Sequence, residues 1–131
     1  MMRLVQQGTG SRRPLVALWL VGSAMDAALR AALGKRPTIV ADVEAPSSVS
    51  LDTVLAYARG QTGAQVGQIV IGGWSLGCSR VRSLLMAGVR PSAVVCADGT
   101  TNTWPAPDPA KAAAWRDLVA SARRGGCAFA V

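Results

Sequence analysis

The sequence contains no histidine among its 131 residues. Histidine is the commonest general base and the commonest metal ligand in proteins, so this absence removes the commonest candidate for each role. Acidic residues are also few, at seven against fourteen lysines and arginines, which gives a formal net charge of +7. The basic residues are scattered and are not interleaved with aromatic side chains, a pattern that argues against nucleic-acid binding.

Long apolar segments are missing too. The longest dense run, residues 15–21, is far shorter than the roughly 20 residues that a membrane-spanning helix requires. The N-terminal segment has no signal-peptide pattern, so we expect a cytoplasmic protein without a membrane partner. The three cysteines form no C-x-x-C pair and lie in or beside apolar segments, which favours buried thiols over disulfides or a zinc site.

Half of the residues are apolar, which suits one compact domain with a substantial core. Five short runs are rich in β-branched residues and apolar on both faces, as the strands of a helix-covered parallel sheet must be. These runs are residues 15–21, 38–43, 68–72, 93–97 and 127–131. Helical patterns lie between them. We expect Gly34, in a left-handed conformation, and Gly60 to end the first two helices, and Ser50 to cap the second.

Strand alternating with helix predicts an α/β protein of three layers, α/β/α, around a five-stranded, mostly parallel sheet. The expected strand order is 2-1-3-4-5. Residues 1–13 are predicted to be a flexible basic leader, and residues 14–131 form the folded domain.

The pentapeptide Gly73-Trp74-Ser75-Leu76-Gly77 fits G-x-S-x-G and falls where the third predicted strand must turn into a helix. A sharp turn there needs flanking residues without bulk, and glycine supplies them. The Ser75 hydroxyl would then stand clear of the sheet, at a helix N-terminus that favours developing negative charge. The alternative is a glycine-rich turn in which Ser75 only caps the helix.

The predicted strand order brings the loops after the first and third strands together in one crevice. A backbone N–H from Ser23 or Ala24, together with that of Leu76, could form a two-donor pocket for the oxyanion of acyl transfer. Ser23 could also simply cap the helix that follows it, and the two roles are compatible.

Residues 15–23, 68–77 and 93–99 together resemble the α/β-hydrolase superfamily, in a minimal layout similar to small cutinase-like esterases and lipases. The resemblance covers nearly the whole chain. It implies that Ser75 is the nucleophile, that the Leu76 N–H is one oxyanion donor, and that the loop at Ser23 supplies the second. The implied reaction is hydrolysis of an ester or similar small acyl substrate, and no metal or other cofactor is predicted.

The sequence departs from that family at the histidine, which should follow the last strands. Three explanations stay open. The domain at residues 14–131 is incomplete at its C-terminal end, so that a further segment or a second polypeptide supplies the base. Alternatively, the chain is a non-catalytic relative with a binding or structural role, or it uses another base.

Asp98 closes the fourth predicted strand, and some family members resemble this arrangement by taking their catalytic acid from that strand. It could equally be a structural residue of the following turn. Trp74 and Trp104 are candidate walls of a substrate site, and Trp74 could instead belong to the core. Asp26, Asp42 and Glu44 are rival carboxylates.

Overall fold

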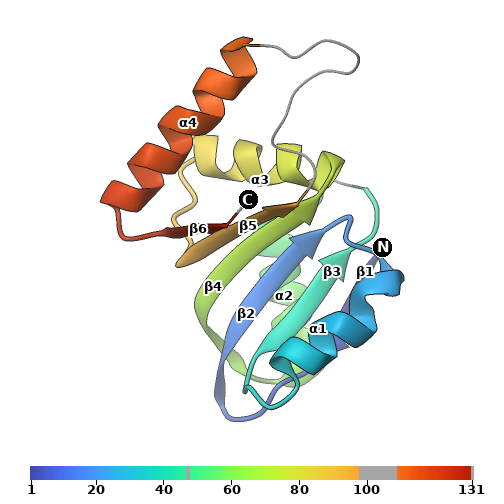
Figure 1. Cartoon of the computed structure of the whole chain (residues 1–131). Helices are drawn as coiled ribbons and strands as arrows, with labels where there is room; N and C mark the ends of the chain where they lie inside the picture. The colour runs from blue at the N-terminus through green and yellow to red at the C-terminus, as the bar shows by residue number, and fades with distance from the viewer. Residues whose placement is uncertain (47, 98–108, 131) are drawn as a thin grey trace.

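The computed structural model describes residues 1–46, 48–97 and 109–130 (Figure 1). Within these residues, strands and helices alternate along most of the chain. The elements are β1 (Met2–Gln6), β2 (Arg12–Trp19), the 3-10 helix η1 (Ser23–Met25), α1 (Asp26–Leu33), β3 (Ile39–Val43), α2 (Leu51–Thr62), β4 (Gln65–Trp74), α3 (Leu76–Met86), β5 (Ala93–Ala97), α4 (Pro109–Arg124) and β6 (Ala128–Ala130). The predicted α/β class is confirmed.

The described strands form one mixed sheet of six, in the order β1-β3-β2-β4-β5-β6. Every neighbouring pair is parallel except β1 and β3, which pair antiparallel. The prediction of a five-stranded sheet in the order 2-1-3-4-5 was therefore wrong for the complete sheet, because it omitted β1. The order within the parallel part is β3-β2-β4-β5-β6.

The prediction of a flexible leader over residues 1–13 was wrong for Met2–Gln6, which is β1, and for Arg12 and Arg13, which begin β2. The basic and polar residues of this segment suggested a solvated arm. In the structure, Val5 is buried against β2 and β3, and Arg3 pairs with a buried carboxylate on β3. Both contacts are made by residues remote in sequence, which is why periodicity within the segment does not reveal the strand.

Helices cover the two faces of the sheet unequally. Figure 1 shows α1 in front of the sheet and α2 behind it. Residues of α2, α3 and α4 share one large hydrophobic core, whereas α1 packs on a smaller core over β1, β2 and β3. This division follows from right-handed crossovers, because β3 lies on one side of β2 while β4, β5 and β6 follow on the other.

The helix ends agree only partly with expectation. Ser50 caps α2, its hydroxyl accepting the Thr53 N–H at 3.1 Å, as predicted. Gly60 does not end this helix, which continues to Thr62 and ends at Gly63 with φ +68°. Gly34 does follow α1, but with φ −60° it is right-handed, contrary to prediction. An exposed glycine within a helix costs only about 1 kcal/mol, so the packing of neighbouring turns decides where the helix ends.

The core contains two tryptophans and the three cysteines. Trp19 and Trp115 are buried, and so are the thiols of Cys78, Cys96 and Cys127, none of which forms a disulfide. Burial, followed by the neighbouring Cys78 thiol, raises the pKa of Cys96 far above its ordinary value. The predicted burial of the three cysteines is confirmed.

Candidate active site

The junction of β4 and α3 is a sharp turn centred on Ser75. Its backbone has φ +51° and ψ −116°, and among the described residues only Leu20 also combines a side chain with positive φ. Two hydrogen bonds hold the turn: the Ser75 N–H donates to the Ala97 carbonyl at 2.9 Å, and the Cys78 N–H donates to the Ser75 carbonyl at 3.0 Å. Such a conformation costs roughly 1–3 kcal/mol and persists only where the surroundings enforce it.

Glycine is required on both sides of this turn. A Cβ at Gly73 would lie 2.4 Å from the Gly77 carbonyl carbon, and a Cβ at Gly77 would lie 2.0 Å from the Trp19 carbonyl oxygen. Both obstacles are backbone atoms, which cannot swing aside as a side chain can. The start of α3 thus packs directly on the ends of β4 and β2.

The side chains at the turn face solvent. Ser75 is exposed, and its neighbours Trp74 and Leu76 are 41% and 71% exposed, although both are apolar. The Ser75 hydroxyl makes no capping hydrogen bond to α3. The interpretation of Ser75 as a mere helix cap is therefore wrong, and so is the interpretation of Trp74 as a core residue.

The loop after β2 lies at the same edge of the sheet, since Trp19 at the end of β2 is paired with Gly73 on β4. Leu20, with φ +61°, turns the chain, and its N–H donates to the Val43 carbonyl at 2.9 Å. Ser23 is exposed in η1, which follows directly. Neither η1 nor α1 has a side-chain cap, so the alternative role of Ser23 as a helix cap is wrong.

A buried carboxylate fixes this loop. Asp42 is fully buried, and it accepts the N–H groups of Val21 at 3.2 Å and Gly22 at 2.9 Å. Its charge is balanced by the Arg3 guanidinium at 2.9 Å, which also pairs with Asp26 and with Glu44. Hydrogen bonding to Asp26, ahead of that to Asp42, raises the pKa of Arg3.

Sequence reasoning treated Asp42 only as a rival carboxylate and placed Arg3 in a leader. A charged residue inside an otherwise apolar strand was the available signal, because a buried carboxylate requires a partner. Two other predicted site residues, Asp98 and Trp104, lie outside the described residues.

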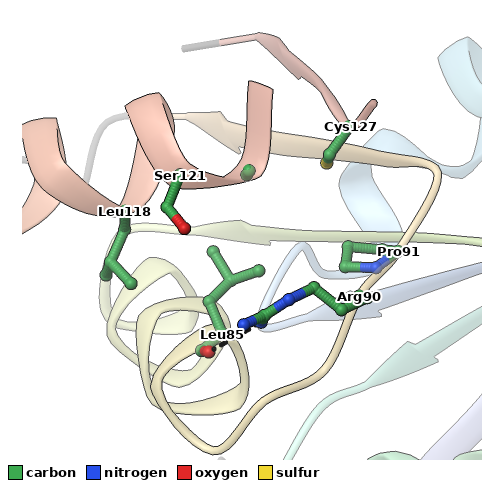
Figure 2. Close-up of a pocket in the computed structure, with 7 residues that line it drawn as sticks. Leu85, Arg90, Pro91, Leu118, Ser121 and Cys127 are labelled. Carbon is green, nitrogen blue, oxygen red and sulfur yellow. Dashed lines mark hydrogen bonds between the residues drawn. The ribbon is translucent and has the colours of Figure 1, made fainter. Parts of the chain in front are cut away.

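An open hollow of about 280 Å³ adjoins the turn and is lined by Ser48, Leu76, Ser79, Arg80 and Ser83. The sequence had given no signal for Arg80. A second cavity, of about 40 Å³, lies at the other end of the sheet, where α3 ends and β5 begins. Figure 2 shows it between α3 and α4, with Arg90 donating to the Leu85 carbonyl. It shares no described lining residue with the hollow beside the Ser75 turn.

None of the helices in residues 1–46, 48–97 and 109–130 is long and apolar enough to cross a membrane. Within the same residues, no group of three or more cysteine, aspartate or glutamate side chains is arranged to hold a metal ion.

The fold is similar to one found among solved structures. The crystal structure of TT1662 from Thermus thermophilus matches with a TM-score of 0.54 and 16% sequence identity, over 95% of this chain and 81% of that chain. At this level of identity the likeness concerns the α/β fold alone. No protein-family model matches the chain, and no curated protein matches it either.

Proposed function

We propose that this protein is a serine acyl-hydrolase that acts on a small ester, with Ser75 as its nucleophile. The observation that carries the proposal is the backbone of Ser75: φ +51° and ψ −116° at an exposed strand-to-helix turn, enclosed by two glycines that cannot accept a Cβ. Strain of this kind is concentrated at functional sites, and here it presents, at a helix N-terminus, a hydroxyl that makes no hydrogen bond to any described residue.

In the proposed reaction, the Ser75 oxygen bonds to the ester carbonyl carbon while a base takes the hydroxyl proton. The carbonyl oxygen becomes an oxyanion, for which the Leu76 N–H and an N–H at Ser23 are the proposed donors. The carbon–oxygen bond to the alcohol then breaks, and the alcohol receives the proton from the base. Water then bonds to the acyl carbon while the base takes a proton from it, the bond between that carbon and the Ser75 oxygen breaks, and the base returns the proton to the Ser75 oxygen, which releases a carboxylic acid.

The chain has no histidine, so the base is proposed to come from a further segment or from a partner chain. Asp98 is the proposed acid that would orient this base, and Trp74 and Trp104 are the proposed walls of the substrate site. Exposed Trp74 and Leu76, one on each side of the nucleophile, offer apolar surface to an acyl chain.

The test replaces the base with a small molecule. The full chain is incubated with a fluorophosphonate probe at increasing imidazole concentrations, and its intact mass is measured. We expect one probe per chain, added faster as imidazole rises, and no addition to Ser75→Ala. The same series with p-nitrophenyl acetate should give a Ser75-dependent release of p-nitrophenolate above the rate of imidazole alone.

The matched control is Ser11→Ala, which removes another exposed serine remote from the turn. It should label like the unaltered chain. Equal labelling of Ser75→Ala and the unaltered chain would contradict the proposal, and so would the absence of labelling at every imidazole concentration.

The second candidate is a non-catalytic binding or structural protein on the same scaffold. The lack of histidine favours it, because loss of the base removes most of the acceleration in triad enzymes. An unreactive Ser75 in the labelling experiment would support this candidate.

A further inference from the structure

The hollow beside Ser75 has the composition of an anion-binding site. Leu76, Ser79, Arg80 and Ser83 line it from α3, and Ser48 lines it from the loop before α2. Residues spaced three, four and seven apart share one helix face, so the serines and the arginine converge on the same space. No carboxylate is among the described residues that line it.

One hydrogen bond to the backbone before α2 anchors the Arg80 guanidinium. Its Nε donates to the Val49 carbonyl at 3.2 Å, and the same carbonyl accepts the indole N–H of the fully buried Trp19 at 3.2 Å. Within the described part of the chain, the terminal nitrogens of Arg80 form no hydrogen bond or ion pair. A planar guanidinium anchored in this way is prepared to bind a carboxylate or phosphate with two parallel hydrogen bonds.

The serine hydroxyls complement the guanidinium. Ser83 donates to the Ser79 carbonyl at 3.0 Å, whereas the hydroxyls of Ser48 and Ser79 make no hydrogen bond to any described residue. Two free hydroxyl donors and a guanidinium suit a ligand that offers only acceptors, and the net charge of +7 favours its approach.

The hollow begins next to the proposed nucleophile, since Leu76 follows Ser75 directly and is one of its walls. Arg80 follows Ser75 by five residues, which corresponds to about 7.5 Å along the helix axis at 1.5 Å per residue. We propose that this hollow binds the carboxylate or phosphate group of a small ligand. Resting on the function proposed above, this ligand is an ester whose scissile carbonyl reaches Ser75 while its anionic end is bound by Arg80.

Anion binding is tested without any reaction. Backbone amide resonances are followed by NMR as the protein is titrated with inorganic phosphate or acetate at constant ionic strength. In the unaltered chain, we expect saturable shifts at Leu76, Ser79 and Ser83. Arg80→Gln should bind about tenfold more weakly, the cost of losing a charge-assisted hydrogen-bonding partner. Arg123→Gln, which removes one exposed positive charge at the end of α4, should bind like the unaltered chain.

Shifts that do not saturate, or equal binding by Arg80→Gln and Arg123→Gln, would overturn the proposal. Because Arg80→Gln also loses the bond to Val49, Ser79→Ala serves as a second variant that leaves this bond in place, and it too should weaken binding. The relative strength of phosphate and acetate then tells the two anion classes apart.

The ester part of the proposal has its own test. With imidazole present, kcat/KM is compared for p-nitrophenyl adipate, which carries a terminal carboxylate, and for neutral p-nitrophenyl hexanoate. We expect a preference for adipate that is lost in Arg80→Gln and kept in Arg123→Gln. If Ser75 proves unreactive while phosphate still binds through Arg80, the hydrolase proposal fails and the anion site is supported. Loss of Arg80-dependent binding with a reactive Ser75 overturns the anion site alone.

Discussion

Ser75 keeps a backbone conformation that costs roughly 1–3 kcal/mol relative to ordinary geometry. The free energy for this comes from its surroundings: α3 packs against β2 through the contact of Gly77 with the Trp19 carbonyl, and the Ser75 N–H is bonded to the end of β5. These contacts fix the backbone of an exposed serine, and a fixed backbone is what a nucleophile needs if it is to meet its base and its substrate in one geometry.

The tight contact at Gly77 gives a prediction for stability. In Gly77→Ala, the new Cβ would lie 2.0 Å from the Trp19 carbonyl oxygen, so α3 must move away from β2. We expect a loss of about 3 kcal/mol or more in the free energy of unfolding, measured by urea denaturation. The control is Gly60→Ala, within α2, where a Cβ meets nothing within 4 Å. It should gain roughly 0.5–1 kcal/mol, because alanine is the better helix former. Similar stability of the two variants would refute the packing argument.

At the scale of elements, β1 forms one edge of the sheet and also carries a residue that pairs with a buried carboxylate. It pairs antiparallel with β3 and brings Arg3 to the carboxyl end of the parallel strands, where Asp42 fixes the loop after β2. That loop is the proposed source of the second oxyanion donor. Arg3 and Asp42 are therefore positioning residues in the proposed mechanism, since they act through the loop.

Replacing Arg3 tests the importance of this pairing. In Arg3→Gln, the fully buried Asp42 loses its cationic partner and keeps only the N–H groups of the loop. We expect the free energy of unfolding to fall by about 3 kcal/mol, since breaking a buried ion pair leaves an uncompensated charge. Arg36→Gln, which alters an exposed arginine, should change stability by less than about 0.5 kcal/mol. Equal losses in the two variants would show that the Arg3 pairing adds nothing.

At the scale of the whole molecule, a buried thiol in the core makes the free energy of unfolding vary with pH in the alkaline range. Cys96 is 1% exposed, and burial raises its pKa above the ordinary value of 9.0. The folded protein therefore keeps this proton at pH values where the unfolded chain releases it. The contribution to stability is fully present below the unfolded pKa and is lost as pH rises above it.

We expect the free energy of unfolding to fall above about pH 9, with Cys96 contributing about 1.4 kcal/mol per pH unit. Urea denaturation from pH 7 to pH 10 measures this slope. Cys96→Ala removes the titrating thiol, so its slope above pH 9 should be shallower by that amount, whatever its stability at pH 7. Parallel slopes for the two proteins would contradict the assignment.

The features that the sequence predicts correctly are those set by interactions between residues close together in the chain. Residues 93–97 were predicted as a strand and form β5, and the turn at Ser75 was placed between a strand and a helix. Both rest on local properties, namely the periodicity of apolar side chains and the space that a missing Cβ leaves. The end of α2 was missed, because Gly60 and Gly63 are equivalent as sequence signals and only packing distinguishes them.

The sequence by itself determined the α/β class, the buried cysteines and a glycine-flanked serine at a strand-to-helix turn, since each depends on residues within a few positions of one another. Only the tertiary structure decided that Met2–Gln6 joins the sheet, that Arg3 reaches Asp42 across 39 positions, and that Arg80 lines a hollow with Ser48. These features depend on which surfaces meet when the chain is folded, and contacts between distant residues leave no periodic pattern along the sequence.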